Sequence, residues 1–144
     1  MRRFFIDASV FFPAIHSERG HARELFVLAG QELVQLVVSD WVLEETRRNL
    51  AYFAPERVVF LDYLLSRVPL EIITVTRRSV QAAAKRVVLK DAPIVAAARK
   101  AKVEALVTYD RKHLLGKPAV AKYIGAQVLT PEGVIELLPR QPRK

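Results

Sequence analysis

The chain contains no cysteine, which excludes disulfide frameworks, zinc–thiolate sites and thiol nucleophiles. It also lacks any apolar run close to the ~20 residues of a membrane-spanning helix, so no membrane segment is expected. The N-terminus is basic, but the apolar run after it reaches Asp7 within a few residues, and a secretory signal is not expected. These absences predict an intracellular, cytoplasmic protein.

Acidic residues are scarce relative to basic ones. The chain has 15 Asp and Glu against 23 Lys and Arg, which gives a formal net charge of +8. This balance suits a polyanionic partner such as RNA, although a solvated basic surface is the alternative. Hydrophobic residues make up 51% of the 144 residues, enough for a packed core. We expect one domain over residues 1–138 and a basic tail over residues 139–144.

Short apolar runs alternate with amphipathic segments along the whole chain. The runs predict buried strands, and the amphipathic segments predict helices. Strands that alternate with helices favour a three-layer α/β/α fold, in which a parallel sheet carries helices on both faces. The expected strands are 3–6, 33–38, 70–75, 105–108 and 126–129, the expected helices are 21–29, 41–50, 55–66, 79–88, 91–102 and 131–138, and a loop is expected at 11–13.

Four carboxylates are placed where such a fold would bring them together. Asp7 and Asp110 each follow a predicted strand, Asp91 precedes a predicted helix, and Glu45 lies within another. Open parallel sheets gather their chemistry beyond the carboxyl ends of the strands. Two unit charges about 4 Å apart repel by about 4 kcal/mol at an effective dielectric of ~20, so converging carboxylates either take up protons or hold a cation. Oxygen ligands alone favour Mg²⁺ or Mn²⁺ over zinc.

Two adjacent glutamates compete for the inward position on one helix. Glu45 lies one turn from Trp41 on the apolar side of the helix. Glu44 faces Arg47 and Arg48 at helical spacing, an ordinary arrangement of solvated ion pairs. Helical phase therefore predicts that Glu45 points inward and Glu44 points to solvent.

Hydroxyl and basic side chains accompany the acids. Ser9 and Thr108 are close in sequence to Asp7 and Asp110, where their hydroxyls either orient a ligand carboxylate or bond to local backbone. The histidines have no regular metal spacing and are expected at the surface. The residues best placed to hold an RNA phosphate follow Asp110 directly, namely Arg111 and Lys112.

Four segments of the chain resemble the PIN-domain ribonucleases, which include the VapC-type toxins and their archaeal relatives. They are Phe-Ile-Asp-Ala-Ser at 5–9, Val-Ser-Asp-Trp-Val-Leu-Glu-Glu at 38–45, Lys-Asp-Ala-Pro-Ile-Val-Ala-Ala-Ala at 90–98, and Leu-Val-Thr-Tyr-Asp at 106–110. Their order and spacing carry a resemblance that covers nearly the whole chain. It implies about five parallel strands in the order 3-2-1-4-5. It also implies that the catalytic, metal-binding acids are Asp7, Glu45, Asp91 and Asp110.

The resemblance further implies a Mg²⁺- or Mn²⁺-dependent endoribonuclease, the toxin partner of a small antitoxin. An RNA-processing nuclease outside a toxin pair and a non-catalytic RNA- or protein-binding domain stay open as alternatives. A HAD-like phosphatase would need a second aspartate at Ser9, and a response-regulator receiver would need paired acids where Ala8 and Ser9 stand. Both are therefore disfavoured.

Two positions depart from the family pattern. Relatives often have a second acid at the position of Lys90 and a small or amide residue at that of Tyr109, which puts metal affinity and substrate access in question.

The helix expected after Pro55 has apolar residues around most of its circumference. Large exposed apolar surface marks interfaces, so this helix predicts a homodimer or a groove for an antitoxin helix. Complete burial of the helix within one subunit is the alternative.

Overall fold

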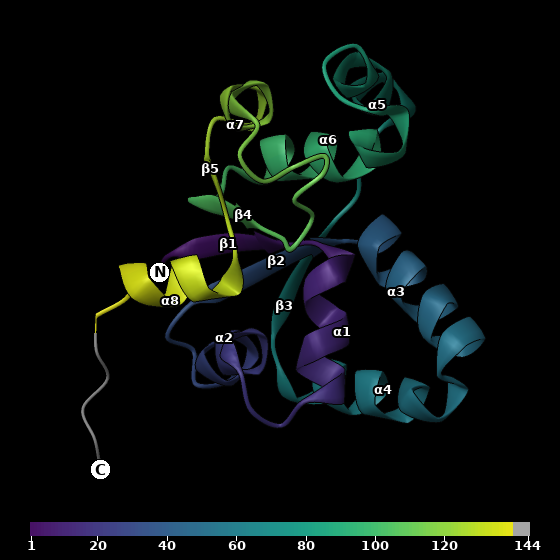
Figure 1. The fold of residues 1–144 in the computed structure, drawn as a ribbon, viewed down its shortest axis with the longest axis vertical. Coiled ribbons are helices and arrows are strands. Elements are labelled where there is room, and N and C mark those ends of the chain that lie inside the picture. The colour runs from purple at the N-terminus through teal and green to yellow at the C-terminus, as the bar shows by residue number, and fades with distance from the viewer. Residues whose placement is uncertain (140–144) are drawn as a thin grey trace.

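A computed structural model describes residues 1–139, and a five-stranded sheet lies at its centre (Figure 1). Every strand pair is parallel, and the strand order β3-β2-β1-β4-β5 confirms the predicted topology. The strands are β1 (Arg3–Ile6), β2 (Gln35–Ser39), β3 (Leu70–Ile73), β4 (Ala105–Val107) and β5 (Gln127–Leu129). The predicted basic tail, apart from Pro139, lies outside the described residues.

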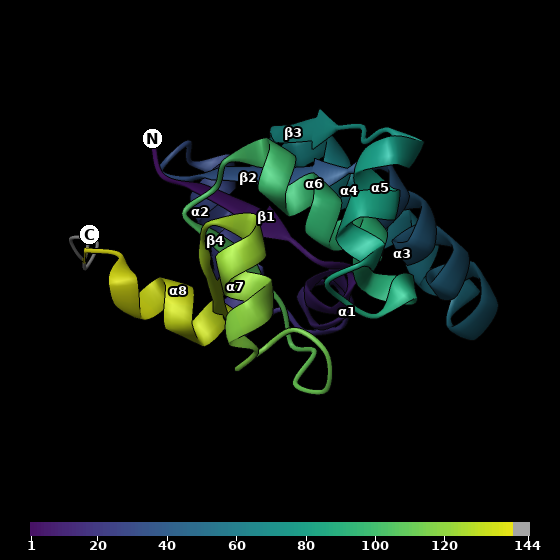
Figure 2. The same cartoon turned by 90° about the horizontal axis from the view of Figure 1, so that it is seen from above.

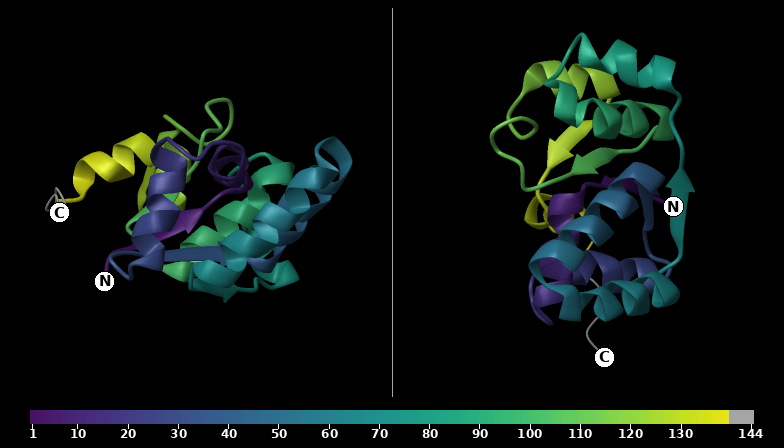
Figure 3. Two further views of the ribbon diagram at one scale, coloured as in Figure 1. Left: turned by 90° about the horizontal axis from the view of Figure 1, so that it is seen from below. Right: turned by 90° about the vertical axis from the view of Figure 1, so that its right-hand side faces the viewer.

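Helices cover both faces of the sheet, as predicted for a three-layer fold. One layer contains α5 (Arg77–Ala84), α6 (Ala92–Ala101) and α7 (Pro118–Ile124), seen in front of the sheet in Figure 2. The opposite layer contains α1 (Ala8–His16), α2 (His21–Gly30), α4 (Val58–Arg67) and α8 (Pro131–Leu137) (Figure 3). The helix α3 (Asp40–Phe53) follows β2 and contacts both α1 and α6, and two short 3₁₀ turns, η1 (Pro55–Arg57) and η2 (Leu89–Asp91), precede α4 and α6.

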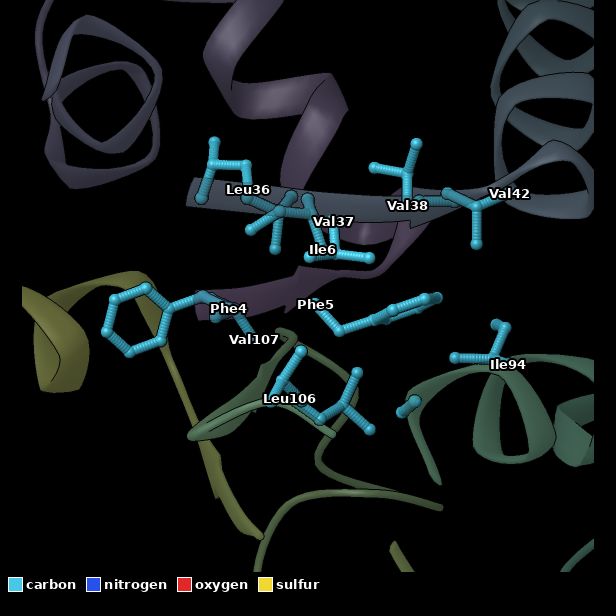
Figure 4. Close-up of a cluster of buried hydrophobic side chains, with 14 of the residues drawn as sticks. Phe4, Phe5, Ile6, Leu36, Val37, Val38, Val42, Ile94, Leu106 and Val107 are labelled. Atoms are coloured by element: carbon cyan, nitrogen blue, oxygen red, sulfur yellow. The ribbon is translucent and has the colours of Figure 1, made fainter. Parts of the chain in front are cut away.

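The core packs around the three central strands. Phe4, Phe5 and Ile6 of β1 are fully buried, as are the apolar residues of β2 and β4 on either side (Figure 4). Fully burying one such side chain stabilises the fold by roughly 1.5–3 kcal/mol. This packing fixes where β1 and β4 end, and it therefore fixes the positions of the polar residues that follow them.

The loop predicted at residues 11–13 is wrong, because α1 continues through it. Asp7 caps this helix by accepting a hydrogen bond from Ala8 N, and Val10, Phe11 and Ala14 bury one face of it. Core burial outweighs the local signal of Pro13, which lies inside the helix. The prediction also omitted α7, although a proline at its first position, Pro118, is a common start signal.

Across residues 1–139 no helix has both the length and the apolar character that a membrane crossing requires.

Candidate functional site

The carboxyl ends of β1 and β4 bring two distant segments into contact. Ile6 and Val107 are register partners in the parallel pair, and Asp7 N donates to Val107 O at 3.1 Å. Asp7 and Thr108 therefore leave the sheet side by side, and both are buried. This confirms the prediction that residues following the first and fourth strands meet at one edge of the sheet.

A network of hydrogen bonds holds the Asp7 carboxylate. Its Oδ2 accepts from Ser9 Oγ at 2.8 Å and from Thr108 Oγ1 at 2.7 Å, and its Oδ1 accepts from Ala8 N at 2.8 Å. The two hydroxyls also accept hydrogen bonds from the backbone: Tyr109 N donates to Ser9 Oγ, and Asp110 N donates to Thr108 Oγ1. Both alternatives weighed for these hydroxyls thus hold at once, because each one orients Asp7 and caps the turn after β4.

Asp91 is buried, with 3% of its surface exposed, at the point where η2 passes into α6. It was expected to cap this helix, but its side chain makes no capping bond. Its Oδ2 has no hydrogen-bond partner in the described part of the chain. Burial raises the pKa of this carboxyl, and the negative charges of Asp110 and then Asp7 raise it further.

His113 lies against Asp91 and was expected at the surface. Its Nδ1 is 4.0 Å from Asp91 Oδ2, and its side chain is mostly buried. The charges of His113 and Lys90 lower the pKa of Asp91 and so oppose the effect of burial. No metal-binding spacing in the sequence pointed to this histidine, because its contact with Asp91 arises only from the tertiary fold.

The structure places Glu45, and not Glu44, toward the other acids. Glu45 is half-buried and Glu44 is exposed, as helical phase predicted. Burial raises the pKa of Glu45, and the charges of Asp7 and Asp91 raise it further. The positive charges of Lys90, which lies in η2, and Arg48 oppose this rise. All four predicted acids therefore share one electrostatic environment, since Asp110 acts on Asp91 in turn.

One detail of the α3 surface differs from the prediction. Arg47, expected beside Glu44, instead pairs with Asp62 of α4 at 2.7 Å. This pair is exposed, so it contributes about 0–1 kcal/mol. It links α3 to α4 on the outside of the molecule and leaves Glu44, which is exposed, without Arg47 as a partner.

Asp110 is half-buried and engaged with the turn that follows it. Its Oδ1 accepts from Lys112 N and His113 N, both at 3.0 Å, while its own N donates to Thr108 Oγ1 at 3.0 Å. These bonds fix the chain after β4 so that Arg111 and Lys112 are exposed beside the acids. The predicted phosphate-binding role of these two residues stays a prediction.

The four acids do not form a closed metal cage. Among residues 1–139, no group of three or more acidic or histidine side chains is arranged to hold a metal ion. Asp7 and Asp110 are held by local donors, and unneutralised carboxylates repel one another. The residues nevertheless fit a hard divalent cation, because all four offer oxygen ligands and the buried Asp91 Oδ2 lacks a donor. The metal-binding assignment therefore stays a proposal.

A hollow of about 260 Å³ opens beside Glu45 and Asp91, between α3 and η2. Trp41, Arg48 and Lys90 also line it. None of these three residues was predicted as part of the site. The hollow combines three acids, Glu44 included, with two cations and an aromatic ring, so its cations can hold a negatively charged group beside the ring.

Tyr109, which departs from the family pattern, points toward α8. Its hydroxyl donates to Glu132 Oε1 at 3.0 Å. Burial and this hydrogen bond raise the pKa of Tyr109 to about 12, so the phenol stays neutral at physiological pH. The residue thereby ties the end of β4 to the start of α8.

Comparison with models of known protein families identifies the family to which this chain belongs. A model of the PIN domain matches residues 4–117. The chain belongs to the PIN-domain family. PIN domains are generally nucleases, and the matched region of this PIN domain contains all four acids described above. No curated protein matches the chain in sequence.

Several solved structures share this fold at low sequence identity. The PAE2754 protein of Pyrobaculum aerophilum is 16% identical, with a TM-score of 0.63 over 94% of this chain and 89% of that chain. A DNA-bound VapBC of Salmonella typhimurium is 20% identical, with a TM-score of 0.64 over 91% and 99%. A toxin–antitoxin complex from Klebsiella pneumoniae is 22% identical, with a TM-score of 0.59 over 88% and 96%. At these identities the likeness establishes the fold.

Proposed function

We propose that this PIN domain is a divalent-metal-dependent endoribonuclease and the toxin of a toxin–antitoxin pair. The observation that carries the proposal is the shared environment of Asp7, Glu45, Asp91 and Asp110 around a buried carboxylate oxygen, Asp91 Oδ2, that accepts no hydrogen bond from the described residues. A buried anionic oxygen without a donor costs free energy, and a bound cation would offset that cost.

The four acids would hold Mg²⁺ or Mn²⁺. When bound, such an ion polarises a phosphate oxygen and lowers the pKa of an attacking water. Asp7 is prepared for this role because Ser9 and Thr108 fix the orientation of its carboxylate. Burial and neighbouring charges raise the pKa of Asp91, which favours its protonated form until a positive charge arrives.

RNA is the substrate that the charge distribution favours. The net charge of +8 attracts a polyanion, and Arg111 and Lys112 are exposed immediately after Asp110. Their guanidinium and ammonium groups would grip the phosphate next to the acids. Single-stranded segments are the accessible form of RNA, because their backbone and bases can be spread across an open site.

The toxin assignment rests on the structural neighbours. The Salmonella structure is described as a VapBC, and the Klebsiella structure as a toxin–antitoxin complex. Their folds span nearly the whole of this chain, which supports the same partnership here. The alternative is an RNA-processing nuclease that functions without an antitoxin.

Cleavage assays on purified protein test the nuclease proposal. We expect cleavage of single-stranded RNA with Mg²⁺ or Mn²⁺ and none with excess EDTA. The Asp91→Asn variant should be inactive, whereas Asp62→Asn, a surface acid of α4, should retain activity. Cleavage that persists in EDTA, or that Asp91→Asn leaves unchanged, contradicts the proposal.

The toxin assignment is tested in cells. Induced expression should arrest growth, and co-expression of a short open reading frame adjacent to the gene should relieve the arrest. An active nuclease that neither arrests growth nor is inhibited by the neighbouring product would instead be the processing enzyme.

A further inference from the structure

The single tryptophan of the chain stands at the rim of the acidic site. Trp41 is in the first turn of α3 and is 47% exposed, although it is the largest apolar side chain in the protein. Trp41 lines the same hollow as Ile94 of α6, and α3 contacts α6. Figure 1 shows the two helices. Leaving so much aromatic surface in water forgoes hydrophobic stabilisation, so a ligand that covers the ring would gain from contact with it.

Trp41 is shared by two adjoining hollows. One is the 260 Å³ hollow that contains Glu45 and Asp91 with the cations Arg48 and Lys90. The other has a volume of about 430 Å³ and lies toward α5. Glu44 also borders both hollows, so the two hollows adjoin at Trp41 and Glu44.

The second hollow has apolar walls and polar edges. Val75, Val80 and Pro93 provide apolar surface close to the indole. Arg77 and Gln81 supply hydrogen-bond donors. The Gln81 amide and the carboxylates of Asp40 and Glu44 supply acceptors. A flat, apolar face with donors and acceptors at its edge is the combination that binds an unpaired nucleobase.

We infer that the hollow beside Trp41 is a nucleobase-binding subsite for single-stranded RNA. One base of the strand stacks on the indole of Trp41, and the phosphate attached to it lies toward Lys90 and Arg48, next to the acids. This inference rests on the proposed ribonuclease function and adds to it the location of a flanking nucleotide. Duplex RNA is excluded from the subsite, because its bases are stacked on one another.

Fluorescence offers a direct measurement, because Trp41 is the only tryptophan. The experiment uses an Asp7→Asn variant so that RNA binds without cleavage. Titration with a short single-stranded oligoribonucleotide should quench the tryptophan emission to saturation. An abasic strand of equal length and an equal concentration of duplex should quench little, and a nucleoside monophosphate should quench only at much higher concentration. Equal quenching by the abasic strand overturns the inference.

Substitution separates stacking from mere contact. In the same background, Trp41→Leu should weaken single-strand binding by roughly 5- to 150-fold, corresponding to the loss of one base–aromatic stack. Trp41→Phe should recover most of the affinity, because it retains an aromatic face. Tyr52→Leu is the matched control, since Tyr52 is 78% exposed at the far end of α3 and should leave binding unchanged.

The outcomes distinguish this inference from the nuclease proposal. If the wild type cleaves RNA in a metal-dependent way while Trp41→Leu binds RNA normally, the subsite is wrong and the nuclease stands. If RNA is neither bound nor cleaved, both fail. Unfolding curves for each variant establish that a loss of binding does not come from a loss of fold.

Discussion

Thr108 Oγ1 donates a 2.7 Å hydrogen bond to Asp7 Oδ2 across 101 positions of sequence. Both residues are buried, and the bond joins the ends of two neighbouring strands. Hydrogen bonds to a charged acceptor contribute about 1.5–3 kcal/mol, more than neutral ones. The contact therefore both stabilises the sheet edge and sets the orientation of an acid of the proposed metal site.

Replacing Thr108 by valine should weaken metal binding in addition to lowering stability. Thr108→Val keeps the shape and removes the donor, so we expect 10- to 100-fold weaker affinity for Mn²⁺, measured by calorimetry. The control is Thr46→Val, because Thr46 is equally buried and donates to Val42 O at 2.8 Å within α3. Both variants should lose stability, but only Thr108→Val should lose affinity for the metal. Equal affinities would remove the positioning role from Thr108.

Neutralising an acid should abolish activity without unfolding the protein. We expect Asp7→Asn, Asp91→Asn and Asp110→Asn each to reduce cleavage by at least about 100-fold, because several kcal/mol of transition-state stabilisation are lost with the metal. Rates of RNA cleavage and circular dichroism spectra are the measurements. Wild-type activity in Asp7→Asn would refute the site assignment.

The adjacent glutamates of α3 should differ in their effects. Glu45→Gln should impair metal binding and cleavage, because Glu45 faces Asp7 and Asp91. Glu44→Gln should change metal affinity by less than about twofold, since Glu44 is exposed and surface pairs contribute about 0–1 kcal/mol. The two substitutions change one atom each, so they form a matched pair. A larger loss in Glu44→Gln would reverse the helical-phase argument.

Stability without metal should fall as pH rises above the usual carboxyl range. The folded-state pKa values of Asp91 and Glu45 are raised above an unfolded value of about 4. Between the two values the folded state binds more protons than the unfolded state, so the free energy of unfolding decreases with pH. Their contribution is complete below about pH 4 and is lost as pH passes the folded pKa values.

Denaturant unfolding across this pH range, in EDTA, measures the effect. Asp91→Asn should show a shallower fall than the wild type, because it removes one of the two groups. Added Mn²⁺ should restore stability to the wild type at neutral pH, by about 2.7 kcal/mol at 100 times its dissociation constant, and should have less effect on Asp91→Asn. If the free energy of unfolding fell equally with pH in the wild type and in Asp91→Asn, the link between protonation of Asp91 and stability would be contradicted.

The α4 helix should form an interface, as its sequence predicts. Val59, Phe60 and Tyr63 are 64%, 46% and 60% exposed, and a hollow of about 680 Å³ lies between this helix and the end of α1. We expect a dimer in light scattering that Phe60→Glu dissociates. Val27→Glu, at an exposed position of α2, is the control and should remain a dimer. A monomeric wild type, or a dimer that a folded Phe60→Glu leaves intact, would remove α4 from the homodimer interface.

The sequence by itself determined the layers of the fold, and it predicted which acids gather at the edge of the sheet. Strand and helix patterns are local, so they predicted the parallel sheet and the positions of Asp7 and Asp110 at its edge. Helical phase is local too, and it separated Glu45 from Glu44. The sequence patterns missed α7 and misread residues 11–13, because Pro13 is a strong local signal that core burial overrides.

Only the tertiary structure decided how these residues meet. Two contacts join segments that are distant in sequence: the hydrogen bond from Thr108 to Asp7 and the approach of His113 to Asp91. The packing also leaves Asp91 Oδ2 buried without a hydrogen bond from the described residues. Such contacts depend on how strands and helices pack in three dimensions, and no periodic pattern records them. The same holds for Trp41, which the sequence placed on the apolar side of its helix and which the tertiary structure leaves 47% exposed beside the acids.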